Sequence, residues 1–193
     1  MLATRPTRAQ LEAVRGTHVD DVLGAGLRLL FVGINPGLWT AAVNAHFARP
    51  GNRFWPALHA AGIVDHPIDA SLGLSDADTA QLVAAGIGIT NLVPMATARA
   101  DELTAAEIVA GGARLRELVA ARAPNVVAIL GITAARAAFG LRGAAVGAQP
   151  DPFEGAELWL LPNPSGLNAH ESVASLARWY GAAAVAAGIE LGR

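Results

Sequence analysis

The chain has 193 residues, a net charge of −2 and no cysteine, and all fourteen of its basic residues are arginine, so it has no lysine either. The length suits one α/β domain with a packed core. Without cysteine there is no disulfide, thiolate nucleophile or cysteine-ligated metal, and without lysine no side-chain amine can form a Schiff base. The slightly negative charge argues against a dedicated non-specific nucleic-acid binder but leaves room for a protein that contacts DNA on one small face.

Although more than half of the residues are apolar, no apolar run is long enough to span a membrane. The first 21 residues mix charged and apolar types and lack the pattern of a secretory signal peptide. We therefore expect a soluble, cytoplasmic protein.

The N-terminal half is predicted to contain both helices and buried strands. Helical patterns occupy 7–14 and 52–61, and another helix is expected after Ser75, which is a typical N-cap because acidic residues follow it. Runs of apolar and β-branched residues at 27–32 and 86–93 indicate strands that are buried on both faces.

The C-terminal half continues this alternation. Thr104 and Glu107 have the spacing of a capping box, and they open a helix that is predicted over 104–122. Short apolar segments at 125–130 and 157–161 are predicted strands. The remaining predicted helices are 133–139 and 171–187.

Strands that alternate with helices predict an α/β fold, a three-layer α/β/α sandwich around a mostly parallel sheet of about four strands. Residues 1–20 are expected to be an N-terminal appendage, and residues 21–193 a single domain. The sequence contains no internal repeat and no low-complexity linker.

Polar loops follow three of the predicted strands, where open α/β sheets bind their ligands. They begin at Asn35, at Asn91 and at Leu161, and the third extends to His170. Two prolines and a glycine stiffen this third loop, and the helix after it offers free N–H groups that suit a phosphate. Asn-Pro and Pro-Gly are also ordinary turn formers, so the ligand-binding interpretation depends on the combination of loops.

Five segments in these regions form a recognisable series. They are Gly-Ile-Asn-Pro-Gly-Leu at 33–38, His-Phe at 46–47, Pro-Gly-Asn-Arg-Phe-Trp at 50–55, Thr-Asn-Leu-Val at 90–93 and Asn-Pro-Ser-Gly-Leu at 163–167. The series resembles the mismatch-specific uracil/thymine DNA glycosylase family, and in particular the bacterial G·U mismatch-specific enzymes. The resemblance implies a uracil-DNA glycosylase-like fold and an enzyme that flips a mispaired uracil, thymine or ethenocytosine out of duplex DNA and hydrolyses its N-glycosidic bond.

By this resemblance, Asn35 is the catalytic residue and holds the attacking water through its side-chain amide. A neutral amide orients water but is a weak base, so it suits a dissociative reaction and predicts a slow enzyme. The alternative is that Asn35 only caps its turn.

The resemblance also implies a binding site for the extruded base. Phe47 stacks on the base or is simply a core residue, and His46 donates to a base carbonyl or is a solvated loop residue. The backbone N–H groups of Ile34 and Phe47 are expected to reach the pyrimidine carbonyls. Asn91 is expected at the base edge, where an amide offers both a donor and an acceptor.

Leu167 matches the wedge that fills the gap left by the flipped nucleotide, unless it is an ordinary exposed leucine. Gly166 and its neighbours would read the partner guanine, and Ser165 would contact a phosphate. Asn163 and Pro164 complete this predicted DNA-contacting segment.

The chain departs from the family pattern after the wedge, where relatives often carry an arginine and this sequence has Asn168-Ala169-His170. Strict dependence on a guanine partner is therefore in doubt, with His170 as a partial substitute. Thr40 is expected at the mouth of the site, beside Trp39, which narrows it or packs. Asp101 is expected either to cap the helix that follows or to act as an additional acid or base.

The absent lysine predicts a monofunctional glycosylase without lyase activity, and no cofactor or metal is expected. The expected partner is double-stranded DNA that carries a mispaired uracil, bound by a monomer. Three alternatives stay open: a broad-specificity deaminated-base glycosylase that also acts on single strands or purine lesions, a non-catalytic DNA- or nucleotide-binding module, and a flavodoxin-like cofactor binder. The last is disfavoured because the first loop lacks a phosphate-cradling Gly/Ser/Thr run.

Overall fold

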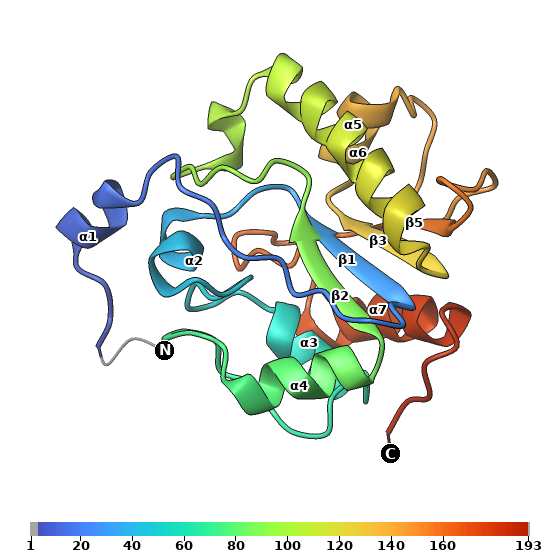
Figure 1. The fold of residues 1–193 in the computed structure, drawn as a ribbon, viewed down its shortest axis with the longest axis horizontal. Coiled ribbons are helices and arrows are strands. Elements are labelled where there is room, and N and C mark those ends of the chain that lie inside the picture. The colour runs from blue at the N-terminus through green and yellow to red at the C-terminus, as the bar shows by residue number, and fades with distance from the viewer. Residues whose placement is uncertain (1–3, 193) are drawn as a thin grey trace.

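The central sheet of the computed structural model has five strands in the order β2-β1-β3-β5-β4 (Figure 1). The structure describes residues 4–192, so residues 1–3 of the predicted appendage and Arg193 of the predicted domain lie outside it. Neighbouring strands are parallel except that β4 runs antiparallel to β5 at the edge. The strands are β1 (Leu29–Gly33), β2 (Ile87–Asn91), β3 (Val126–Leu130), β4 (Gly147–Ala148) and β5 (Glu157–Leu161).

The predicted α/β class and mostly parallel sheet are confirmed, and each predicted strand is present with ends shifted by at most two residues. The fifth strand, β4, was not predicted because two residues are too few to show a hydrophobic period. The described helices are α1 (Arg8–Ala13), α2 (Leu38–Val43), α3 (Phe54–Ala60), α4 (Asp76–Ala84), α5 (Ala105–Arg122), α6 (Ile132–Phe139) and α7 (Val173–Ala186), with a short 3₁₀ helix η1 (Ala100–Glu102).

Two of the predicted helix starts are confirmed by their caps. Ser75 accepts a hydrogen bond from the Asp78 N–H at the start of α4. Thr104 and Glu107 form both bonds of a capping box at the start of α5. Asp101 therefore does not cap this helix, and that alternative was wrong. The 3₁₀ helix η1 and the helix α2 were not predicted, and α2 is only six residues long and starts at Gly37 without a side-chain cap.

Each face of the sheet is covered by its own helices, which gives the three layers (Figure 1). Successive side chains of a strand point to opposite faces, so β1 contributes Leu30 and Val32 to one core and Leu29 and Phe31 to the other. The first core is closed by residues of α5 and α6, and the second by residues of α3, α4 and α7. These two cores hold the carboxyl ends of the strands in place, and the polar loops begin there.

Polar contacts hold α1 and the turn that follows it against the rest of the protein. α1 buries no residue. The Arg15 guanidinium pairs with Glu12 of α1 and, at 2.6 Å, with Glu102 of η1. The Gly16 N–H donates to the Ala96 carbonyl at 2.9 Å. The division into an appendage and a domain stays a prediction.

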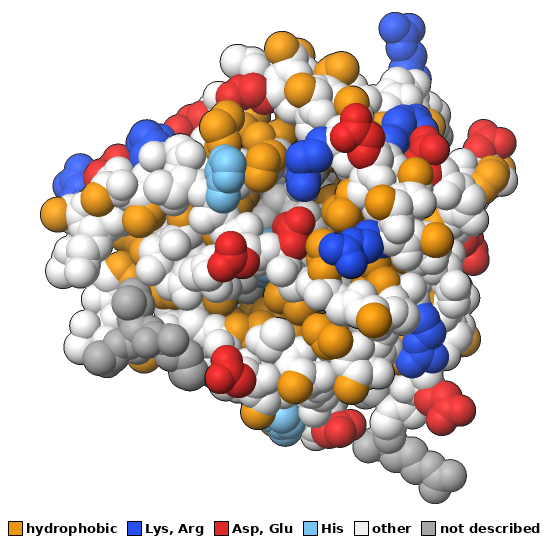
Figure 2. Space-filling model, viewed as in Figure 1, with side chains coloured by type: hydrophobic (Ala, Val, Ile, Leu, Met, Phe, Trp, Pro, Cys, Tyr) orange, Lys and Arg blue, Asp and Glu red, His pale blue; other side chains and the backbone are white. Residues whose placement is uncertain are grey.

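The molecular surface mixes both signs of charge. On the face shown in Figure 2, arginines are interspersed with carboxylates and apolar side chains and do not form a continuous basic patch. Within residues 4–192, no helix has both the length and the apolar character needed to cross a bilayer.

Candidate active site

Four parallel strands end at one edge of the sheet, and their order places β1 between β2 and β3. The chain therefore winds to one side from β1 to β2 and to the other side at β3, and ligands bind at such a switch point in open α/β sheets. A cavity of about 140 Å³, called here the strand-end cavity, lies at this edge. Its lining residues come from the ends of all four parallel strands, from α2 and from the loops: Ile34, Asn35, Pro36, Gly37, Thr40, Phe47, Arg49, Asn52, Asn91, Ala100, Leu130 and Asn163.

The strand-end cavity is small compared with the roughly 300–1,000 Å³ of pockets for drug-sized ligands, so it suits a group of about one ring. It brings together six residues that the sequence singled out for the site: Ile34, Asn35, Thr40, Phe47, Asn91 and Asn163.

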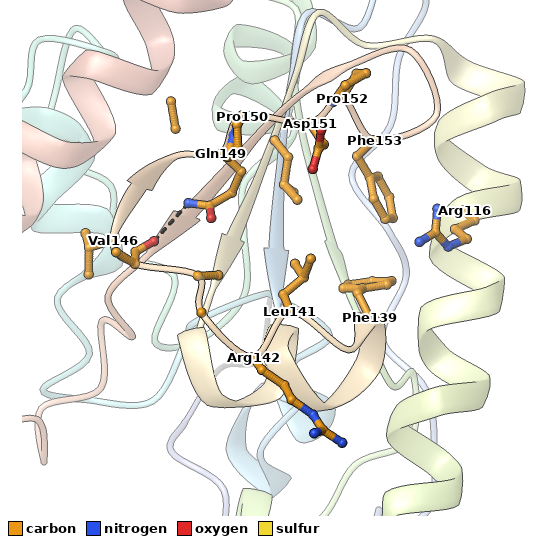
Figure 3. Close-up of a pocket in the computed structure, with 15 residues that line it drawn as sticks. Arg116, Phe139, Leu141, Arg142, Val146, Gln149, Pro150, Asp151, Pro152 and Phe153 are labelled. Carbon is orange, nitrogen blue, oxygen red and sulfur yellow. Dashed lines mark hydrogen bonds between the residues drawn. The ribbon is translucent and has the colours of Figure 1, made fainter.

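A larger cavity of about 520 Å³ lies next to β4 and shares no lining residue with the strand-end cavity (Figure 3). Its Arg116 guanidinium lies over the Phe153 ring, 4.8 Å from the centroid, and pairs with Glu154 at 2.6 Å. This cation is already engaged by the protein. The arrangement therefore stabilises the wall of the larger cavity.

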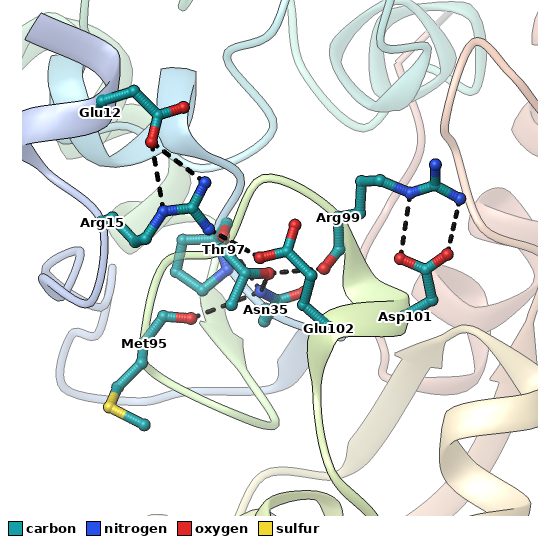
Figure 4. Close-up of polar contacts among 9 residues, drawn as sticks. Glu12, Arg15, Asn35, Met95, Thr97, Arg99, Asp101 and Glu102 are labelled. Atoms are coloured by element: carbon teal, nitrogen blue, oxygen red, sulfur yellow. Dashed lines mark hydrogen bonds and ion pairs between the residues drawn. The ribbon is translucent and has the colours of Figure 1, made fainter. Parts of the chain in front are cut away.

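The Asn35 side chain is held by its NH₂ group (Figure 4). Its Nδ2 donates to the Thr97 hydroxyl at 2.7 Å, to the Pro36 carbonyl at 3.2 Å and to the Met95 carbonyl at 3.4 Å. None of the hydrogen bonds among the described residues ends on Asn35 Oδ1. The amide oxygen is therefore the atom that Asn35 can offer to a molecule in the strand-end cavity.

Thr97 fixes the orientation of the Asn35 side-chain amide. The Thr97 hydroxyl donates its proton to the Arg99 carbonyl at 2.7 Å, so toward Asn35 it can only accept. The Met95 carbonyl can also only accept. Both partners therefore require the Nδ2 end of the amide, and they fix Oδ1 on the other side.

Asn91 is oriented in the same way by a buried histidine. His46 is 2% exposed, and its Nε2 lies 3.0 Å from the Asp20 carbonyl, so that nitrogen carries the proton. Its Nδ1 then accepts from Asn91 Nδ2 at 3.2 Å. Burial lowers the pKa of His46 below its ordinary value, although the negative charge of Asp21 acts in the opposite direction. The ring therefore stays neutral, and Nδ1 remains an acceptor.

The Asn91 oxygen lies above a glycine that leaves room for it. Gly33 is opposite Asn91 in the ladder between β1 and β2, and a Cβ on Gly33 would lie 2.4 Å from Asn91 Oδ1 and 3.2 Å from Phe47 Cζ. Only glycine fits under both groups. An amide oxygen and an aromatic ring are thus brought together at the floor of the strand-end cavity.

Phe47 has an unusual backbone conformation for a bulky residue, with φ of +54°. Its half-buried ring stacks on Phe54 with the centroids 4.1 Å apart and an interplanar angle of 26°. Such backbone strain persists only where the surroundings impose it, and it is frequent at functional sites. Phe47 both packs on the core and lines the cavity, so it combines the two alternatives raised for it.

The segment 163–171, called here the wedge loop, has its own internal hydrogen bonds. Asn163 Oδ1 accepts from the Ser165 N–H at 2.9 Å, and the Ser165 hydroxyl accepts from the Leu167 N–H at 3.3 Å. The Leu167 side chain projects from this frame and is 83% exposed. Single exposed apolar side chains are common on protein surfaces, so this exposure fits both the wedge and the ordinary loop residue.

Arg53 holds the wedge loop through hydrogen bonds to its backbone carbonyls. Its guanidinium donates to the carbonyls of Ser165, Asn168 (2.8 Å) and Glu171, and its backbone N–H donates to the Pro164 carbonyl at 2.9 Å. Three carbonyls on one planar cation fix the path of the loop. The loop also approaches the protein closely at Gly166, where a Cβ would lie 2.6 Å from the Gly51 carbonyl.

Two of the sequence expectations need correction. His46 is not a solvated loop residue, and both of its ring nitrogens already have protein partners, so it contacts Asn91 and does not line the strand-end cavity. Asp101 pairs with Arg99 at 2.6 Å and lies outside the cavity lining. His170 is exposed in the wedge loop, and its role as a partial substitute for the arginine of relatives stays a prediction. Trp39 packs on the core and donates to the Ser71 carbonyl at 2.8 Å.

Three residues in or near the site were given no role from the sequence, namely Thr97, Arg53 and Arg49. Thr97 lies beyond the end of the second predicted strand, and nothing in the sequence points to its contact with Asn35. Arg53 lies within the Pro50–Trp55 segment that carried the resemblance, but no role was inferred for it. Arg49 is the charged side chain among the lining residues of the strand-end cavity.

A family model of the Uracil DNA glycosylase superfamily matches residues 21–185, so the chain belongs to this superfamily. Among solved structures, the chain is similar to the solution NMR structure of a candidate uracil DNA glycosylase from Methanosarcina acetivorans. The TM-score is 0.55 and the sequence identity 19%, over 86% of this chain and 93% of that one. At this identity the likeness shows a common fold. The strand-end cavity is therefore a candidate active site on a uracil-DNA glycosylase-like scaffold.

Proposed function

We propose that the protein is a monofunctional DNA glycosylase that flips a mispaired uracil out of duplex DNA and hydrolyses its N-glycosidic bond. The observation that carries the proposal is the Asn35 amide, whose NH₂ group is bound by Thr97 while its oxygen is left for the strand-end cavity. A water that donates one hydrogen to Asn35 Oδ1 keeps a lone pair for the sugar.

In this reaction the water oxygen bonds to C1′ as the C1′–N1 bond breaks, and the bonding electrons leave with the base. The attacking water loses its proton to solvent after the sugar has developed positive charge, so the weak basicity of an amide suffices. The backbone N–H groups of Ile34 and Phe47 are the proposed donors to the base anion. Thymine shares the N3–H of uracil and is also covered by this proposal, whereas ethenocytosine, which has no N3–H, is the least favoured of the three bases that the resemblance suggests.

The orientation of Asn91 supports a preference for uracil over cytosine. Asn91 gives one N–H to His46 and holds its oxygen near Phe47, in the place proposed for the base. That oxygen can accept the N3–H of uracil or thymine, whereas cytosine has an unprotonated nitrogen at the same position. Two acceptors facing each other repel, and a base with an acceptor at this edge is disfavoured.

The exposed Leu167 supports a wedge role in duplex DNA. Extrusion costs a few kcal/mol and least for a mispaired base, which supplies part of the mismatch preference. Phe47 would then stack on the extruded ring. Without lysine, no side-chain amine can attack the sugar, so the product is an intact abasic site.

A second function, a broader glycosylase that also acts on single strands, is favoured by the side chain of Asn168. Its Nδ2 donates to the Asn163 carbonyl at 3.1 Å, and its Oδ1 accepts from the His170 N–H at 3.2 Å. Both ends of the amide are therefore used within the wedge loop. A side chain so engaged gives little grip on the partner strand, and dependence on a guanine partner is relaxed.

One panel of substrates tests both versions. The protein is incubated with G·U and G·T duplexes, an A·U duplex and single-stranded uracil DNA, and each product is divided between mild workup and hot alkali. Alkali-dependent cleavage of G·U alone supports the mismatch-specific enzyme, and similar cleavage of A·U or single strands supports the broader one. Strand breaks without alkali contradict the monofunctional proposal, and no cleavage of any substrate contradicts the glycosylase proposal.

A further inference from the structure

A second cavity adjoins the strand-end cavity on the side of the N-terminal segment. It has a volume of about 470 Å³ and shares Gly37 and Arg49 with the strand-end cavity. Its other walls include Arg5 and Leu11 of the N-terminal segment and Trp39 of α2. We call it the N-terminal groove, and it continues directly from the place proposed for the flipped base.

The wall that α1 contributes is not explained by core packing. α1 packs against α2 but buries none of its own residues, and its C-terminal end is held by the Arg15 ion pairs and the Gly16 backbone bond. Leu11 is half-buried at the groove. A helix held beside the site in this way shapes the groove, and it adds little to the core.

The groove combines apolar walls with two guanidinium groups. Leu11, Trp39 and Pro50 provide apolar surface, and the Trp39 ring is fixed by its N–H bond to the Ser71 carbonyl. Arg49 is exposed and makes no hydrogen bond or ion pair with its side chain among residues 4–192. Arg5 is exposed as well, and its charge adds to the lowering of the Asp69 pKa, which is caused chiefly by hydrogen bonds from Ser71.

We propose, on the basis of the proposed glycosylase function, that the N-terminal groove binds the nucleotide next to the flipped one, with its phosphate on Arg49 and Arg5. A nucleotide matches the groove because its base is flat and largely apolar on its faces while its phosphate is anionic. Arg49 lines both cavities, so it lies where the backbone of a strand that enters the strand-end cavity must pass. The N-terminal segment thereby becomes part of the DNA-binding surface.

The salt dependence of binding tests the phosphate contacts. The probe is a duplex with a tetrahydrofuran abasic analogue opposite guanine, which the enzyme cannot cleave, and binding is followed by fluorescence anisotropy over a range of salt. Each lost phosphate contact should reduce the slope of log K against log [salt] by about 0.9, so Arg49→Gln and Arg5→Gln should each show this loss and the double variant about twice as much. Arg142→Gln, which removes the same charge beside the larger cavity, should keep the wild-type slope.

A pair of variants on α1 tests the groove itself. Leu11→Glu puts a carboxylate into the groove, whereas Ala9→Glu puts the same charge on an exposed position of the same helix that does not line it. Leu11→Glu should weaken binding of the abasic duplex by about 10-fold or more and Ala9→Glu by no more than about 2-fold. Because α1 buries no residue, thermal melting should be similar in both.

Shortening the analogue-bearing strand identifies the occupant. Removing the nucleotides on one side of the abasic analogue should weaken binding by the wild type and have much less effect on Leu11→Glu. Equal effects of Leu11→Glu and Ala9→Glu, or unchanged salt slopes in the arginine variants, would overturn the groove proposal while wild-type cleavage of uracil DNA still stands. A wild type that neither binds nor cleaves such DNA would overturn the proposed function instead.

Discussion

Asn35 and Asn91 are two side-chain amides whose orientations are fixed by protein groups that accept hydrogen bonds from them. Thr97 accepts from one, and His46 accepts from the other through a nitrogen that burial keeps unprotonated. In both cases the NH₂ group faces the protein and an acceptor oxygen remains for the strand-end cavity. We infer that the first oxygen receives a hydrogen from water and the second receives the N3–H of the base.

Thr97→Val tests the first of these orientations. Valine has the shape of threonine but cannot accept the 2.7 Å bond from Asn35, so the amide can rotate and the water loses its position. We expect the single-turnover rate of uracil release to fall by about 10-fold or more, with affinity for abasic duplex unchanged.

Thr97→Ser is the matched control, because it keeps the hydroxyl that bonds both Asn35 and Arg99. It should cleave at close to the wild-type rate. Equal rates for the valine and serine variants would contradict the role given to Thr97.

The sequence could identify Asn35 and Asn91 because each lies near the carboxyl end of a predicted strand, where a polar loop begins. It could not orient either amide, since Thr97 is 62 residues from Asn35, and His46 is 45 residues from Asn91. The same limit explains the wrong prediction for His46. A histidine in a polar segment is predicted to be exposed, because the local sequence does not show which distant residues bury it.

The wedge loop and the start of α3 form one supporting unit at the scale of structural elements. Arg53 precedes α3 and binds three carbonyls of the loop, while the Leu167 side chain is exposed to solvent. If Arg53 holds the loop in place, replacing it should lower the cleavage rate only on substrates whose cleavage requires the Leu167 wedge. Duplex and single-stranded substrates should then respond differently.

A double-mutant cycle makes this prediction measurable. Arg53→Lys keeps the charge but loses the planar fork, and Leu167→Ala removes the wedge. Each single variant should slow cleavage of a G·U duplex by about 10-fold, and the double variant should be little slower than either. Cleavage of single-stranded uracil DNA should change little in all three variants. If the rate losses of the two single variants multiplied in the double variant, or if single-stranded DNA lost as much rate as the duplex, Arg53 would act by another route than holding the wedge loop. Thermal melting of each variant would show whether a lower rate comes from poor folding.

The predictability of the elements depended on their length and on local signals. The parallel strands, the Ser75 N-cap and the Thr104–Glu107 capping box were visible because apolar runs and cap residues are local features of the chain. α2 and β4 are short and depend on tertiary packing, so neither has a clear period in the sequence. The support of the wedge loop by Arg53 joins segments 112–118 residues apart, which local patterns cannot reveal.

The stability of the whole molecule should depend on pH through His46. Its pKa is lowered in the folded state by burial, so the unfolded chain takes up a proton that the folded chain does not. Stability should therefore fall as the pH drops below about 6.5, the ordinary histidine value, with a slope of at most about 1.4 kcal/mol per pH unit from this group.

Urea unfolding between pH 7 and 5 measures this effect. His46→Gln should flatten the dependence in this window, because glutamine has no proton to gain. His59→Gln, at an exposed position of α3, is the control and should keep the wild-type dependence. The same slope in all three proteins would contradict the account of His46.

The measurement that tests the central claim most directly is single-turnover release of uracil from a G·U duplex by Asn35→Ala, together with its affinity for the abasic-analogue duplex. The account predicts a rate lower by about 100-fold or more with nearly unchanged affinity, because the variant still holds the DNA but no longer positions the water. A variant that releases uracil within a few-fold of the wild-type rate would contradict it.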